Sequence, residues 1–63
     1  MENEPILKEN GKCRKNRVSY DIWHNVETNR YWLYVKTLMG QVIYQKEFGT
    51  WDKARDYLKR NYL

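Results

Sequence analysis

The spacing of the apolar residues changes at Gly49 and Thr50, and this change restricts the possible folds more than any other feature of the chain. Before it, three short segments alternate between apolar and polar residues, which is the period of a β-strand. These segments are 18–25, 30–37 and 41–48. After Thr50, apolar residues recur at the spacing of one helix face, at Ala54, Tyr57 and Leu58. The sequence therefore predicts three strands followed by one helix.

The residues between these elements favour the same division. Gly40 is suited to a positive φ in a hairpin loop, and Thr50 is a favourable helix N-cap. Short connections make neighbouring strands antiparallel, so we expect an α+β fold: a three-stranded antiparallel β-meander packed against one C-terminal α-helix (βββα). Residues 1–17 contain few large apolar residues and predict a flexible N-terminal arm, which leaves 18–63 as the folded domain.

The lengths of the loops predict which side chains share a face of the sheet. Four-residue loops at 26–29 and 38–41 place Ile22 opposite Leu33 and Val35 opposite Tyr44. The face under the helix then carries Val18, Tyr20, Ile22, Tyr31, Leu33, Val35, Val42, Tyr44, Lys46 and Phe48, covered by Trp51, Ala54, Tyr57 and Leu58. The other face carries Ser19, Asp21, Trp23, Trp32, Tyr34, Lys36, Ile43, Gln45 and Glu47.

The stretch "RYWLYVKTLMGQVIYQKEFGTWDKARDYL" resembles two groups of small domains. One is the YegP-like bacterial family, to which "YDIWHN", "RYWLYVK", "GQVI" and "GTWDKA" correspond. The other comprises three-stranded-sheet-plus-helix DNA-binding domains of the ethylene-response-factor and integrase arm-binding type. "FGTWDKARDY" is similar to the Phe-x-Thr-x-x-x-Ala-x-x-Tyr portion of the plant domain. The first resemblance implies little beyond a fold. The second implies DNA binding through the exposed sheet face, where this chain offers Trp and Tyr with Lys36 and Arg30.

The net charge of +4 is unevenly distributed along the chain. Residues 10–17 contain no acid and four cations, Lys12, Arg14, Lys15 and Arg17. Basic clusters attract polyanions through counterion release, although a small net charge also serves solubility alone. Two interpretations of the basic arm therefore stay open, a phosphate-binding segment and a solvated tail.

Residues that carry enzyme chemistry are scarce. The chain has one His, one Cys and one Ser, at His24, Cys13 and Ser19, and no glycine-rich phosphate loop. We therefore expect a non-enzymatic protein without a metal or cofactor. A single cysteine excludes an intramolecular disulfide and suits a cytoplasmic protein. No apolar run approaches the roughly 20 residues of a membrane span, so we expect no membrane partner.

The strongest candidate for a binding surface is an aromatic strip on the uncovered sheet face, formed by Trp23, Trp32 and Tyr34. Such a strip is suited to stacking unpaired bases, with Arg30, Lys36 and the basic arm beside it for phosphates. It is also suited to a homodimer or protein-partner interface, because Trp and Tyr dominate binding hot spots. Cross-strand aromatic pairing that only stabilises the sheet is the third interpretation. Nucleic-acid binding is the leading hypothesis because charge and aromatic residues coincide; the alternative is a protein-interaction module, a homodimer or a small inhibitor or adaptor.

Overall fold

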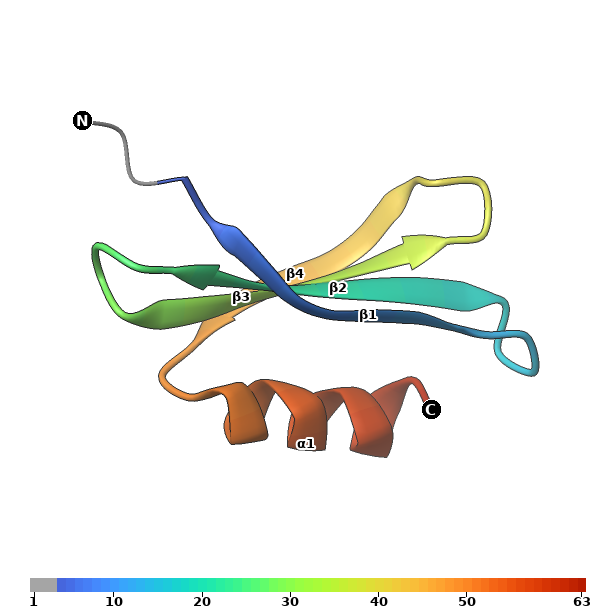
Figure 1. Cartoon of the computed structure of the whole chain (residues 1–63). Helices are drawn as coiled ribbons and strands as arrows, with labels where there is room; N and C mark the ends of the chain where they lie inside the picture. The colour runs from blue at the N-terminus through green and yellow to red at the C-terminus, as the bar shows by residue number, and fades with distance from the viewer. Residues whose placement is uncertain (1–3) are drawn as a thin grey trace.

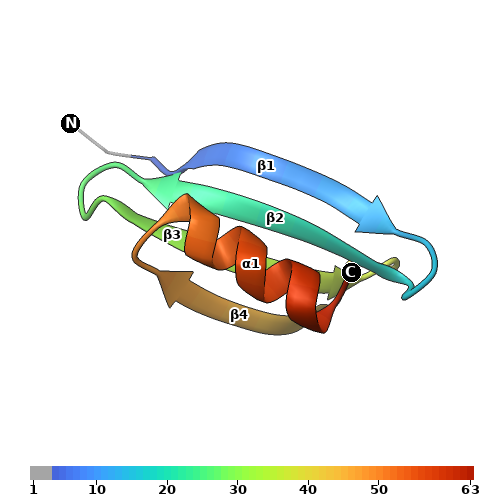
Figure 2. The same ribbon diagram turned by 90° about the horizontal axis from the view of Figure 1, so that it is seen from below.

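The computed structural model describes residues 4–63 as four antiparallel strands and one helix (Figure 1). The elements are β1 (Ile6–Cys13), β2 (Val18–Asn25), β3 (Arg30–Thr37), β4 (Val42–Phe48) and α1 (Trp51–Asn61). The strands form one sheet in the order β1-β2-β3-β4, and α1 lies along one face of it against β3 and β4 (Figure 2). The α+β class, the antiparallel sheet and the C-terminal helix are confirmed. No helix within residues 4–63 is long and apolar enough to cross a membrane.

The predicted count of three strands is wrong, because residues 6–13 form the edge strand β1. This segment pairs antiparallel with β2, with one irregularity between Leu7 and Glu9. Most of its side chains are exposed, and of its residues Cys13 packs against the core. The strand is therefore held mainly through its backbone, and the alternation that identifies the other strands is weak. Residues 1–3 of the expected arm lie outside the described residues.

The core lies between α1 and the sheet face that the helix covers. Its buried side chains are Val18, Ile22, Leu33, Val35, Ala54 and Leu58. The predicted pairing of Ile22 with Leu33 is confirmed. Aromatic rings close the core on the β4 side, where Tyr44 stacks on Tyr57 with ring centroids 5.0 Å apart.

The start of α1 follows the prediction in one respect and differs in another. Thr50 is the N-cap, and its Oγ1 accepts a hydrogen bond from the Lys53 backbone N–H at 3.1 Å. Trp51 was expected to cover the core but is 37% exposed. Its indole Nε1 instead donates to Glu9 Oε1 at 3.0 Å, which ties the helix to β1.

The connection between β3 and β4 moves one residue out of the predicted core. The loop closes one residue earlier than predicted, at Gln41 instead of Val42. The Thr37 N–H donates to the Gln41 carbonyl at 2.8 Å, and Gly40 has φ +94°. An irregularity in β4 then restores the predicted pairing of Val35 with Tyr44. A bulge of this kind interrupts the alternation of faces. Val42 consequently pairs with Lys36, is 45% exposed, and does not contribute to the core.

Candidate functional site

The aromatic strip forms where β2 and β3 pair at the centre of the sheet. Trp23 lies directly opposite Trp32, as predicted. Their chain neighbours Ile22 and Leu33 are fully buried under α1, so the two indoles belong to the face without a helix. Tyr34 follows on the same face of β3, with its ring centroid 6.2 Å from that of Trp32 and the ring planes 23° apart. All three side chains are half-buried, so part of each aromatic surface is open to solvent.

These rings line an open groove of about 470 Å³. Its lining residues are Pro5, Trp23, Asn25, Trp32, Tyr34, Lys36 and Val42. The volume is within the range of about 300–1,000 Å³ that is typical of small-molecule sites. The groove extends from Pro5, immediately before β1, to Val42, at the start of β4. Its size and its aromatic lining suit a flat ligand that lies against the rings.

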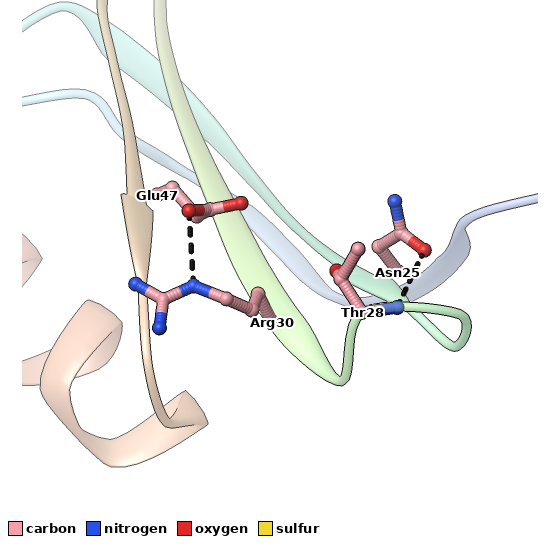
Figure 3. Close-up of polar contacts among 4 residues, drawn as sticks. All are labelled: Asn25, Thr28, Arg30 and Glu47. Carbon is pink, nitrogen blue, oxygen red and sulfur yellow. Dashed lines mark hydrogen bonds and ion pairs between the residues drawn. The ribbon is translucent and has the colours of Figure 1, made fainter.

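Each of the two cations predicted for the strip is paired with a carboxylate from a neighbouring strand. Lys36 Nζ lies 2.9 Å from Asp21 Oδ2. Arg30 Nε lies 2.9 Å from Glu47 Oε1, as Figure 3 shows. Lys36 lines the groove, whereas Arg30 does not. The strip therefore combines aromatic surface with partly neutralised charge.

The four cations of the expected basic arm occupy the hairpin between β1 and β2. Lys12 lies in β1 opposite Ser19, and both line a smaller hollow of about 280 Å³ that shares Lys36 with the aromatic groove. Arg14, Lys15 and Arg17 belong to the turn, which closes when the Arg17 N–H donates to the Arg14 carbonyl at 3.3 Å. Basic charge thus continues from the Lys36 end of the groove to a formed turn.

The same turn is attached to the end of the helix. Asn16 Nδ2 donates a hydrogen bond of 2.6 Å to the Tyr62 carbonyl oxygen, across 46 positions of the sequence. The basic residues of the turn are therefore displayed at a defined end of the sheet, beside the last turn of α1, where Lys59 and Arg60 add further charge.

Three of the residues that line the groove were not predicted from the sequence to belong to it. Pro5 was assigned to the arm and Val42 to the core, and neither position signals a groove before β1 and the bulge are known. Asn25 ends the predicted strand 18–25, and strand alternation from Trp23 places it on the outer face, so this signal was present in the sequence. By contrast His24 lies on the other face, stacked on Tyr31 with ring centroids 4.4 Å apart.

Comparison with known proteins yields no relative: no family model, curated protein or solved structure matches the chain. The two resemblances described from the sequence stay expectations, and the site is interpreted from its own geometry.

Proposed function

We propose that this protein is a small, non-enzymatic nucleic-acid-binding protein that stacks unpaired bases in the outer-face groove. The observation that carries the proposal is the gathering of three aromatic side chains in one open groove, with Lys36 at one end of it. Stacking of a base on an aromatic side chain contributes about 1–3 kcal/mol and tolerates any sequence, because every base has a π-face. In a duplex these faces are already stacked, so single strands are the expected ligand.

The basic turn supports the same proposal through charge. Lys12, Arg14, Lys15 and Arg17 lie beyond the Lys36 end of the groove and suit the phosphates of a strand that leaves it. Cations that neutralise phosphates release counterions, so the affinity is expected to fall with added salt. The unpaired thiol of Cys13 is compatible with a reducing cytoplasm as the site of this activity.

The ion pairs favour a second candidate, a protein-interaction module. Asp21 pairs with Lys36 and Glu47 with Arg30 within the sheet. These ion pairs neutralise the two cations, so the strip is aromatic rather than strongly basic. A surface of this kind suits a homodimer or the docking of a protein partner, because interface cores are depleted in unpaired charge and enriched in Trp and Tyr.

One titration separates the two candidates. Fluorescence anisotropy of a labelled single-stranded oligonucleotide is measured at low and high salt, together with sedimentation of the protein alone. Nucleic-acid binding predicts a monomer whose affinity falls with salt and drops about tenfold or more in Trp32→Ala. Trp51→Ala, on the helix, is the matched control: it removes an indole outside the groove together with the hydrogen bond to Glu9. Once circular dichroism shows that the variant is folded, it should bind like the parent protein. A tight dimer that ignores the oligonucleotide would contradict the proposal and support the interface.

A further inference from the structure

The orientation of the Asn25 amide is fixed by the turn that follows β2. Its Oδ1 accepts hydrogen bonds from two backbone N–H groups, that of Glu27 at 3.0 Å and that of Thr28 at 3.4 Å. A rotated amide would direct its NH₂ group at these two donors, so the oxygen must face the turn. Figure 3 shows the amide nitrogen directed away from the Thr28 nitrogen. Within residues 4–63, Asn25 Nδ2 donates no hydrogen bond to a side chain or to the backbone.

Asn25 also lines the groove, two residues after Trp23 in β2. Pro5 lies near it on the side of β1, because Ile6 pairs with His24. The other polar lining groups are mostly donors as well. The indoles of Trp23 and Trp32 and the ammonium of Lys36 donate only, and the Tyr34 hydroxyl is able to do either. Apart from the Tyr34 hydroxyl and Asn25 Oδ1, which is occupied by the turn, the lining side chains therefore carry no hydrogen-bond acceptor.

We infer that the groove selects an unpaired base that presents a carbonyl oxygen at its edge, and that Asn25 Nδ2 donates to this oxygen. This inference rests on the proposed function and assigns it a ligand class: uracil, thymine, cytosine and guanine each carry a carbonyl oxygen at an edge, whereas adenine carries none and presents an amino group at C6. An amino group directed at Asn25 Nδ2 would leave two donors facing each other without an acceptor, which costs affinity.

The sharpest test compares hypoxanthine with adenine, because both are purines of nearly equal size. They differ at C6, in a carbonyl or an amino group, and at the adjacent N1, which carries a proton in hypoxanthine and none in adenine. Two labelled single-stranded oligonucleotides are used, identical except that hypoxanthine replaces adenine throughout. The parent protein is expected to bind the hypoxanthine strand about three- to tenfold more tightly, the effect of one hydrogen bond gained and one clash of donors avoided.

Asn25→Asp is the matched variant. The carboxylate keeps an acceptor for the Glu27 and Thr28 N–H groups, so the turn is retained, but it has no donor to offer the base. Its negative charge weakens the binding of both strands, so the readout is the ratio of the two affinities rather than either affinity. This ratio is expected to fall to about one or to reverse. Circular dichroism confirms that the variant is folded.

The outcomes distinguish the inference from the function on which it rests. Equal affinities of the parent protein for the two strands, with Trp32→Ala still defective, would overturn the carbonyl preference and leave base stacking in place. A preference that persists in Asn25→Asp would overturn the role of Asn25. Failure of the protein to bind either strand would overturn the proposed function and this inference together.

Discussion

The ring of Tyr20 covers the backbone of Gly11, its direct partner across β1 and β2. A Cβ atom at Gly11 would lie 2.6 Å from the Tyr20 hydroxyl oxygen and 2.8 Å from Cζ, closer than such atoms approach in proteins. A glycine opposite an aromatic residue lets the ring take the place of the missing side chain. This pairing explains how an edge strand with few large apolar residues is attached to the sheet.

Gly11→Ala is expected to lower the free energy of unfolding by about 1–2 kcal/mol, because the methyl group forces the Tyr20 ring or β1 to move. Urea denaturation followed by circular dichroism measures the loss. Gly49→Ala is the matched control: the nearest atom to its Cβ is Arg30 Nη1 at 3.8 Å, an ordinary contact. A Gly11→Ala protein as stable as Gly49→Ala would show that Tyr20 yields without cost.

The contact between Glu9 and the helix gives a second prediction. Glu9 Oε1 accepts a hydrogen bond from Trp51 Nε1 and lies 3.1 Å from Arg55 Nε. Glu9→Gln retains an acceptor but removes the ion pair, so the expected loss is under about 1 kcal/mol at low salt and smaller at high salt. Urea midpoints at the two salt concentrations measure it. A loss that is the same at both would mean that the charge of Glu9 is unimportant.

Stability at alkaline pH is expected to depend on Tyr44. A side-chain hydrogen bond with Tyr57, together with burial and the neighbouring hydroxyls of Tyr57 and Tyr62, raises the pKa of Tyr44 from 10.0 to about 12. The folded state therefore favours the neutral hydroxyl. The resulting stabilisation is complete below pH 10, the ordinary pKa, and is lost as the pH rises from there to about 12.

Tyr44→Phe isolates this contribution, because phenylalanine has no proton to lose. The free energy of unfolding of both proteins is measured by urea titration from neutral pH to the alkaline range. The parent protein should lose more stability than Tyr44→Phe above pH 10. A difference between the two proteins that stays constant with pH would contradict the linkage.

Asp21→Asn tests whether the ion pair with Lys36 restrains nucleic-acid binding. The substitution removes a negative charge from the outer face and frees the ammonium for phosphate, so single-stranded oligonucleotides should bind about two- to fivefold more tightly at low salt. Asp56→Asn makes the same change of charge on the helix, where Asp56 pairs with Arg60. An equal gain from both variants would indicate that only the net charge matters.

The sequence predicted the elements whose side chains enter the core. Alternation predicts strands β2 and β3, and the length of the turn between them predicts the register that pairs Trp23 with Trp32. Helical spacing predicts α1 with its Thr50 cap. Strand β1 was not predicted, because it is attached by backbone pairing and by the ring of Tyr20 over Gly11. Neither contact produces an alternation of apolar residues in the sequence. The prediction that Val42 lies on the core face was wrong, because the bulge in β4 depends on how the loop before it closes.

The candidate site was predicted in its aromatic part and incompletely in its polar part. Trp23, Trp32, Tyr34 and Lys36 come together as expected. The pairing of Lys36 with Asp21 was missed, although the predicted outer face already carried both residues on adjacent strands. The contribution of Pro5 required the course of β1, which the sequence pattern did not reveal.

The position of Pro5 in the groove wall has a practical consequence for any binding assay. A purification tag that joins the chain ahead of Pro5 is expected to lie near the groove, because Pro5 is part of the groove wall. The carboxyl terminus follows α1 on the opposite side of the sheet (Figure 1). We therefore expect a His tag or fluorophore placed there to leave the aromatic rings accessible, and one joined ahead of Pro5 to weaken the binding that the assay measures.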